Sequence, residues 1–283
     1  MIEPLQLTGD VQGALLRPDE PTGPGVIVLT GSSGRVDVDR ARLFAERGAV
    51  ALAQRWWGGE GQAPGINHIP IEVIVRGIDR LQAEGCDRIA LLGVSRGAEA
   101  VLLTAARDAR VELVIAVSPS AVVWQNMGPG LKGELWPPRS SFTWQGVPLP
   151  FIVYDPRPWP APGPAKPSFR RVHEQSLITF AEDVPAASIP IEQARAEIIL
   201  VAGGADLVWP SVAAARQIAA RLASFGKAAT VIEHAGAGHS PVFPGEPVLP
   251  EPADHAWGGE PAADRELGAM AWAEITRRLA LTP

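Results

Sequence analysis

Cysteine is nearly absent from this sequence: Cys86 is the single one among 283 residues. A lone cysteine cannot form an internal disulfide or supply a cysteine metal cluster, so we interpret Cys86 as a packing residue. The histidines show no H-x-x-x-H or comparable metal-ligand spacing. We therefore expect no metal ion and no other cofactor.

Long apolar runs and an excess of basic charge are also lacking. No run approaches the ~18 apolar residues that span a bilayer, and the amino terminus has no basic region followed by an apolar core, the mark of a signal peptide. The formal net charge of −6 disfavours a nucleic-acid partner, because binding to phosphates needs a basic surface. We expect a cytoplasmic protein without membrane or nucleic-acid partners, and the sequence gives no indication of its oligomeric state.

What the chain does contain is an alternation of apolar runs and helix-like segments. The runs typical of buried strands are residues 25–30, 49–54, 89–92, 113–117, 197–202 and 228–233. Helices are expected near residues 37–48, 70–84, 98–106, 211–224 and 264–281. Pro70 suits the first position of the second helix, where its missing N–H costs nothing. A hairpin of residues 5–7 and 11–17 precedes this alternation.

Alternating strands and helices predict an α/β fold with a mostly parallel central sheet and helices on both faces. Right-handed crossovers place every loop that follows a strand's carboxyl end on one rim of such a sheet. The length suits one large domain, and we expect residues 1–283 to form it.

The alternation breaks between about residues 121 and 190, a proline-rich segment with few convincing helices. Its position between two sheet strands predicts an inserted cap or long rim loops, and a disordered linker is the alternative. The segment contains four tryptophans: Trp124, Trp136, Trp144 and Trp159. An apolar pocket for an acyl or aromatic group is the hypothesis that these indoles suggest, and ordinary packing is the alternative. The residues expected to form that pocket are Trp56, Trp57, Trp124, Trp144 and Trp209.

A reactive serine is predicted at Gly93-Val94-Ser95-Arg96-Gly97. The motif is G-x-S-x-G between a strand and a helix, which is the context of a nucleophile elbow. The turn is so tight that a Cβ at either glycine would collide with neighbouring backbone. Ser95 is therefore expected in a strained conformation above the sheet edge, whereas the alternative is an incidental serine in a glycine-rich turn.

A serine hydroxyl needs a base to accept its proton, and the base needs a third group to hold its tautomer. Asp206 and His239 each follow a predicted strand on the same rim as Ser95. The chain order serine, aspartate, histidine is that of the α/β-hydrolases. We predict Ser95, Asp206 and His239 as a catalytic triad, the alternatives being a turn aspartate and a surface histidine.

The oxyanion formed from the attacked carbonyl needs preorganised donors. The backbone N–H of Arg96, directly after the nucleophile, is the first expected donor. The second should come from the loop Gly31-Ser32-Ser33-Gly34. The sequence does not choose between its serines; Ser33 is preferred and Ser32 is the alternative.

No catalytic role is predicted for the other polar residues considered. Glu99, four residues after the nucleophile, could pair with a rim arginine or face solvent. The other histidines are expected to be structural: His68, His173, His234 and His255.

Several motifs together resemble one known family. These are residues 93–99 (GVSRGAE), 118–120 (SPS), 122–124 (VVW), 148–151 (PLPF), 189–192 (IPIE), 203–211 (GGADLVWPS) and 236–239 (GAGH). They resemble the catalytic domain of the acyl-CoA thioesterases and bile acid-CoA:amino acid N-acyltransferases, within the α/β-hydrolases, from about residue 20 to the carboxyl terminus. The resemblance implies an α/β-hydrolase fold, thioester substrates and the same triad, Ser95, Asp206 and His239.

Two features depart from that family. Its animal thioesterases carry an amino-terminal β-sandwich domain, whereas this chain starts almost directly with the catalytic part. Its acyltransferase branch uses a cysteine nucleophile, and Ser95 favours hydrolysis over transfer to an amine. Charges in the segment 121–190 are nearly balanced, so no obvious cradle for CoA phosphates is predicted.

From the sequence we predict a serine hydrolase that cleaves a small-molecule carboxylic thioester or ester through an acyl-enzyme. A carboxylesterase of the dienelactone-hydrolase kind, acting on small esters, is the second hypothesis. A non-catalytic ligand-binding protein that keeps the fold is the third.

Overall fold

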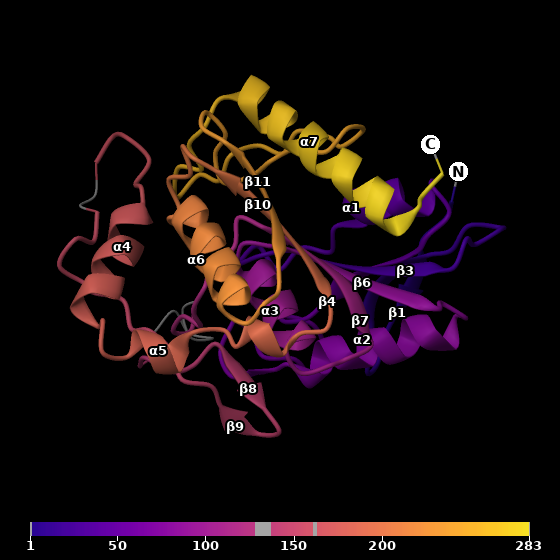
Figure 1. Cartoon of the computed structure of the whole chain (residues 1–283), viewed down its shortest axis with the longest axis horizontal. Coiled ribbons are helices and arrows are strands. Elements are labelled where there is room, and N and C mark those ends of the chain that lie inside the picture. The colour runs from indigo at the N-terminus through magenta and orange to yellow at the C-terminus, as the bar shows by residue number, and fades with distance from the viewer. Residues whose placement is uncertain (1, 128–136, 161–162, 283) are drawn as a thin grey trace.

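The central sheet positions everything else in this protein. The structure is a computed structural model that describes residues 2–127, 137–160 and 163–282. The sheet has eight strands in the order β1-β2-β4-β3-β6-β7-β10-β11 (Figure 1). These strands are β1 (Leu5–Leu7), β2 (Gln12–Leu16), β3 (Pro24–Leu29), β4 (Val50–Arg55), β6 (Arg88–Val94), β7 (Val111–Val117), β10 (Glu197–Gly203) and β11 (Ala229–His234).

Pairing in the sheet follows the predicted pattern. The hairpin strands β1 and β2 pair antiparallel, and β2 pairs antiparallel with β4. Every other pairing, from β4 through β11, is parallel. The prediction of a mostly parallel sheet is confirmed, and the carboxyl ends of β3, β6, β7, β10 and β11 lie on one rim.

Helices cover both faces of the sheet. One face carries α1 (Val38–Ala45) and α7 (Pro261–Leu279), and the other carries α2 (Glu72–Ala83), α3 (Arg96–Ala105) and α6 (Ser211–Ser224) (Figure 1). Strand residues alternate between the two cores: Val26 and Val28 pack with α1 and α7, whereas Ile27 and Leu29 pack with α2 and α3. This period of two explains why the central strands are apolar without interruption.

Smaller elements lie between β7 and β10, where the sequence predicted an insertion. They are β8 (Phe142–Trp144), β9 (Val147–Pro148), α4 (Arg170–Thr179), α5 (Val184–Ala187) and the 3₁₀ helix η1 (Ile191–Gln193). Trp136, one of the tryptophans of this segment, lies outside the described residues. Three isolated β-bridges join residues within this segment: Val122 with Ser188, Trp124 with Ile152, and Gln125 with Ser140. The segment thus brings short helices and strands to the carboxyl-end rim.

One local prediction is wrong. Pro70 does not begin the second helix; it lies in β5 (Ile69–Pro70), which pairs with β8, and α2 begins at Glu72. Pairing with the distant residues Phe142 and Thr143 holds this stretch extended. Such a partner is far along the chain, so local spacing could not predict it.

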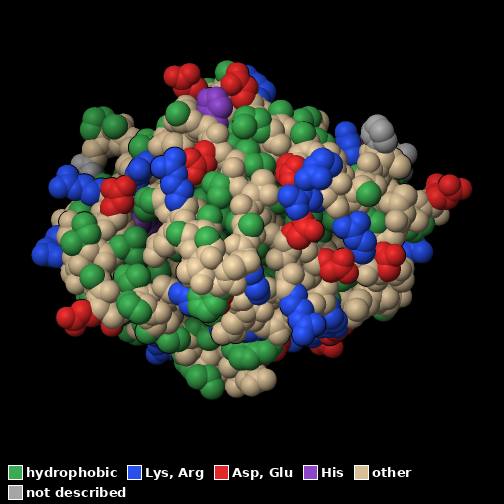
Figure 2. Space-filling model, viewed as in Figure 1, with side chains coloured by type: hydrophobic (Ala, Val, Ile, Leu, Met, Phe, Trp, Pro, Cys, Tyr) green, Lys and Arg blue, Asp and Glu red, His purple; other side chains and the backbone are tan. Residues whose placement is uncertain are grey.

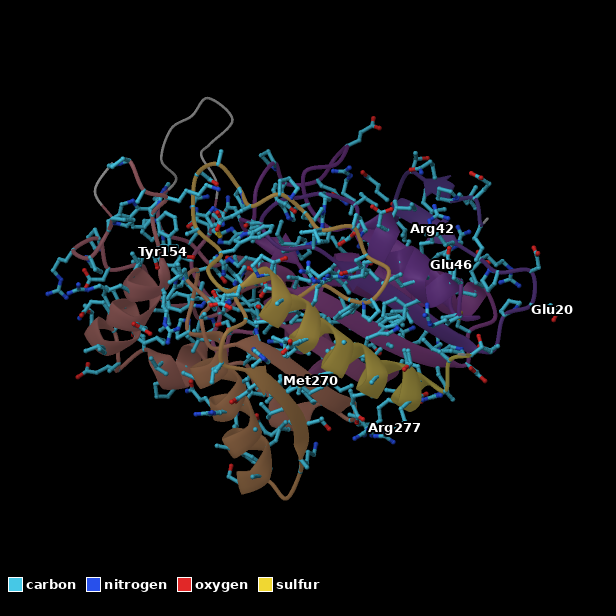
Figure 3. All side chains as sticks on the ribbon, turned by 90° about the horizontal axis from the view of Figure 1, so that it is seen from above. Glu20, Arg42, Glu46, Tyr154, Met270 and Arg277 are labelled. Carbon is cyan, nitrogen blue, oxygen red and sulfur yellow. The ribbon has the colours of Figure 1, made fainter. Side chains whose placement is uncertain are left out.

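Charges of both signs are interspersed on the face seen in Figure 2. Viewed from above, Arg277 lies toward the carboxyl end of α7, while Tyr154 lies near α4 at the other end of the molecule (Figure 3). Met270, also on α7, borders Val231 and Glu233 of β11. No helix in the described part of the chain has the length and apolar character needed to cross a membrane.

Candidate active site

Ser95 occupies a sharp turn between β6 and α3. Its backbone has φ 57° and ψ −119°, a conformation that a residue with a side chain rarely adopts. A Cβ on Gly93 would lie 2.1 Å from the carbonyl oxygen of Gly97, and one on Gly97 would lie 2.6 Å from that of Thr30. Both glycines are therefore required by close approach of backbone. The serine is held by its surroundings, since its N–H donates to the Val117 carbonyl at 2.9 Å.

Asp206 and His239 meet on the same rim. Asp206 follows β10 and His239 follows β11, and the Nδ1 atom of His239 lies 2.9 Å from Oδ2 of Asp206. Both side chains are buried. The other oxygen of Asp206 accepts N–H groups from Val208 at 2.8 Å and Trp209 at 3.2 Å. Asp206 is thereby fixed against His239, and an imidazole that donates its Nδ1–H to this carboxylate carries its free lone pair on Nε2.

Glycines allow the loops around His239 to pack closely. A Cβ on Gly203 would lie 2.2 Å from the carbonyl oxygen of Gly238, and one on Gly238 would lie 2.0 Å from that of Gly258. The hydroxyl of Ser118, at the end of β7, donates to the His239 carbonyl at 2.8 Å. The glycine-rich sequence before His239 thus packs closely against its neighbours.

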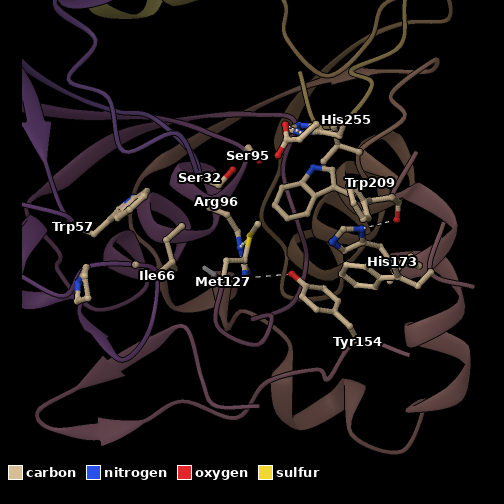
Figure 4. A pocket seen from close by; sticks show the side chains of 17 residues that line it. Ser32, Trp57, Ile66, Ser95, Arg96, Met127, Tyr154, His173, Trp209 and His255 are labelled. Carbon is tan, nitrogen blue, oxygen red and sulfur yellow. Dashed lines mark hydrogen bonds and ion pairs between the residues drawn. The ribbon is translucent and has the colours of Figure 1, made fainter. Parts of the chain in front are cut away.

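Two cavities adjoin Ser95. The first, here called the aromatic cavity, has a volume of about 550 Å³ and is lined by Ser95 and Arg96 with Trp57, Tyr154, Trp159, Phe169, His173 and Trp209, among others (Figure 4). The second, here called the histidine cavity, has a volume of about 460 Å³ and is lined by Ser95 and His239 with Gly31, Ser32, Ser33, Arg35 and Trp257, among others. Ser95 therefore borders a largely aromatic space on one side and a more polar one on the other.

The expected oxyanion donors surround Ser95. Arg96 is the first residue of α3, so its N–H has no partner within the helix. A Cβ on Gly31 would lie 2.9 Å from the Ser95 Cβ, which shows how closely the loop 31–34 approaches. Ser32 lines both cavities that Ser95 lines, whereas Ser33 lines only the histidine cavity. Ser32 therefore borders more of the space around Ser95 than Ser33 does, although Ser33 is the serine preferred from the sequence.

Glu99 does not face solvent, so that alternative is wrong. Its side chain is fully buried, and its Oε2 accepts from the Arg96 guanidinium at 2.6 Å. Oε1 accepts the N–H of Trp124 at 3.0 Å. Burial raises the pKa of the Glu99 carboxyl, and the neighbouring guanidinium opposes that shift. The Arg96 side chain also donates to the Gln125 carbonyl and to the Ser141 hydroxyl, so the pair ties the elbow to the inserted segment.

The predicted pocket tryptophans separate into two groups. Trp57 and Trp209 line the aromatic cavity, and Figure 4 shows them on opposite sides of it. The other three do not line it. Trp56 is buried and stacks on Phe142, Trp124 is buried against Tyr154 and His173, and Trp144 lies over Arg107. These three match the packing alternative.

Several lining residues were missed from the sequence. Tyr154, Phe169 and His173 come from the inserted segment, which carried no motif for them. His173 was expected to be structural; it is buried among rings, and burial lowers its pKa to about 4. The tryptophans of the inserted segment were the one sequence feature that pointed to a pocket there, and one of them, Trp159, does line the cavity.

Cys86 lies away from this site. The Sγ of Cys86 borders Gly25 at the start of β3, the end opposite to the rim. Burial raises the pKa of its thiol to about 11, so the thiol stays protonated at neutral pH. Among the described residues, no group of three or more His, Cys, Asp or Glu is arranged to hold a metal ion.

Comparison with known sequences identifies a family. Residues 80–280 match the family described as BAAT / Acyl-CoA thioester hydrolase C terminal. The chain is 26% identical to human acyl-coenzyme A thioesterase 1, covering 96% of this chain and 63% of that protein. It is 28% identical to mouse peroxisomal succinyl-coenzyme A thioesterase (94% and 62% covered). It is 26% identical to mouse bile acid-CoA:amino acid N-acyltransferase (95% and 62% covered).

The chain thus spans less than two thirds of the length of these curated relatives. Other relatives include a human acyl-coenzyme A thioesterase 2 named as mitochondrial. With mitochondrial and peroxisomal proteins among them, the cytoplasmic location expected from the sequence stays a prediction.

Solved structures agree on the fold. A proposed dienelactone hydrolase from Klebsiella pneumoniae superposes with a TM-score of 0.56 at 15% identity, covering 99% of this chain and 98% of that one. A proposed alpha/beta hydrolase from Agrobacterium tumefaciens superposes with a TM-score of 0.55 at 14% identity, covering 99% and 100%. The predicted α/β-hydrolase fold is confirmed, and so is the family resemblance noted in the motifs.

Proposed function

Because the chain belongs to the BAAT / Acyl-CoA thioester hydrolase C-terminal family, we propose that it is a serine hydrolase that cleaves a carboxylic thioester or ester through an acyl-enzyme. The observation that carries the proposal is the buried contact of His239 with Asp206 beside a strained Ser95, which lines the same cavity as His239. The family description includes hydrolysis of acyl-CoA thioesters. The serine nucleophile and the acyl-enzyme are what we add to it.

In the proposed mechanism, Ser95 Oγ attacks the acyl carbon and His239 Nε2 accepts the serine proton. Asp206 orients the imidazole and stabilises its charged form. The bond to the leaving sulfur or oxygen then breaks, and His239 returns the proton to it. A water molecule, activated by the same histidine, next cleaves the acyl-serine bond and releases the acid.

The developing oxyanion is proposed to bind two backbone N–H groups. Arg96 supplies one at the start of α3, where the helix dipole also favours negative charge. Ser32 supplies the other, in place of Ser33, because it borders both cavities next to the nucleophile. A serine nucleophile also favours water over an amine as acyl acceptor, so hydrolysis is proposed rather than transfer.

The second candidate is an esterase acting on small oxyesters. The arginines that line the histidine cavity are already paired, Arg35 with Asp37 at 2.9 Å and Arg40 with Glu246. They offer little to the phosphates of a CoA leaving group, which supports a smaller alcohol or thiol there. Turnover of matched acyl-CoA thioesters and oxyesters separates the two candidates, and negligible thioester cleavage would eliminate the first.

A fluorophosphonate that reacts with activated serines tests the serine mechanism. The wild type should be labelled, and Ser95→Ala should lose all labelling. Ser224→Ala, which changes an exposed serine at the end of α6, is the matched control and should label as the wild type does. An unlabelled wild type, or equal labelling of Ser95→Ala, would show that Ser95 is no activated nucleophile and that the fold serves binding alone.

A further inference from the structure

The position of His239 sets the direction in which a substrate must lie. His239 has to pass its proton to the leaving group, and it lines the histidine cavity. Ser95 is shared by both cavities, while Arg96 lines only the aromatic one. A leaving group in reach of His239 therefore occupies the histidine cavity, and the acyl group extends from Ser95 into the aromatic cavity.

The walls of the aromatic cavity are rings that hold one another in place. Tyr154 and His173 meet edge to face at 5.2 Å between ring centroids, and His173 meets Trp209 at 5.6 Å. Trp159 meets Phe169 at 5.2 Å. Across the space stands Trp57 (Figure 4). These walls are preformed and present both faces and edges of rings, the two surfaces that aromatic ligands contact best.

Among the described residues that line this cavity, no arginine or lysine is left without a negatively charged partner. Of the described residues that line it, Arg96 is the one arginine, and its guanidinium is paired with Glu99 at 2.6 Å. Burial lowers the pKa of His173 to about 4, so its imidazole is neutral at neutral pH. His255, at the edge, contacts Asp254 at 2.9 Å. A carboxylate carried by the acyl group would lose its hydration here without gaining a partner.

From these three observations we propose that the preferred acyl group is neutral and carries a ring. The cavity has a volume of about 550 Å³, so a short acyl group in it would remain surrounded by water. A straight chain long enough to fill it would lose the rotational freedom of many bonds on binding, whereas a ring is already rigid before it binds. This proposal rests on the proposed function, since it assumes that Ser95 attacks the acyl carbon.

The test compares acyl groups on one leaving group. Phenylpropionyl-CoA and nonanoyl-CoA have equal numbers of acyl carbons, and succinyl-CoA adds a terminal carboxylate. Thiol release is followed with a thiol-reactive dye. We expect kcat/KM for phenylpropionyl-CoA to exceed that for nonanoyl-CoA by about tenfold, from one or two ring contacts, and succinyl-CoA to be the poorest of the three. The para-nitrophenyl esters of the same acids are measured in parallel.

Trp159→Leu links any preference to this cavity. Trp159 lines the cavity and is 53% exposed, so its loss should leave the fold intact. We expect the variant to raise KM for phenylpropionyl substrates by about fivefold and to raise KM for nonanoyl substrates by less, because a flexible chain loses apolar contact but no ring–ring contact. Trp144→Leu is the matched control, because Trp144 lines neither cavity, and it should change neither KM.

The outcomes separate this proposal from the proposed function. Faster turnover of nonanoyl than of phenylpropionyl groups, on either leaving group, would overturn the ring preference while leaving the hydrolase intact. Succinyl-CoA as the best substrate would overturn the neutral acyl group. Absence of turnover with every substrate, together with absence of serine labelling, would overturn the proposed function itself.

Discussion

The buried ion pair between Arg96 and Glu99 makes a quantitative prediction about stability. The two side chains are 1% and 0% exposed and lie 2.6 Å apart. Replacement of Glu99 by Gln keeps the shape and keeps an oxygen that can accept the Trp124 N–H, but it removes the negative charge. The Arg96 guanidinium would then stay buried without a counter-charge.

Removal of one partner of a buried pair costs about 3–5 kcal/mol. We expect Glu99→Gln to lower the free energy of unfolding by that amount, which corresponds to a fall in Tm of about 5–8 °C for a chain of 283 residues. Denaturant unfolding followed by tryptophan fluorescence measures it. Glu112→Gln is the matched control, because Glu112 pairs with Arg88 at 3.6 Å with both side chains well exposed. This surface change should stay within about 0.5 kcal/mol.

A double-mutant cycle separates the ion pair from the packing of each side chain. Arg96→Met alone leaves Glu99 buried and unpaired, so it should also be strongly destabilising. The double variant Arg96→Met/Glu99→Gln should lose less than the sum of the single losses, with a coupling of at least about 1 kcal/mol. Additive losses, or a Glu99→Gln loss below about 1 kcal/mol, would refute the view that the pair stabilises the elbow.

Two further predictions concern the site. Asp206→Asn should lower kcat by about 10⁴-fold, because an amide no longer favours the tautomer of His239 whose Nε2 accepts a proton. Steady-state kinetics measure kcat, and a loss below about tenfold would count against the role assigned to Asp206. Burial lowers the pKa of His173 to about 4 from its ordinary 6.5, so the folded protein binds fewer protons than the unfolded chain in that range, and stability falls as pH falls from 6.5 toward 4. His173→Phe should remove up to about 3 kcal/mol of that dependence in denaturant unfolding at several pH values, and an unchanged pH profile would contradict it.

Much of the fold could be predicted because its signals are local. The backbone conformations of β3 and of the elbow follow from residues that are adjacent in the sequence. An uninterrupted apolar run predicts a buried strand, and two glycines flanking a serine predict a tight turn. The helix start at Pro70 could not be predicted, because a strand pairing with residues more than seventy positions away holds it extended. The same holds for Glu99: its partner Arg96 is local, but its other carboxylate oxygen accepts the N–H of Trp124, 25 residues further along the chain.

For the site, the sequence by itself determined the residue types and their order. Ser95, Asp206 and His239 each follow a strand, so a parallel sheet places them on one rim whatever the rest of the chain does. Only the tertiary structure decided the shape of the space around Ser95. It took Trp56 and Trp124 into the core and brought Tyr154 and His173 to the cavity wall. The physical reason is that a pocket is made where elements distant in sequence fail to fill space, and no local pattern encodes such a gap.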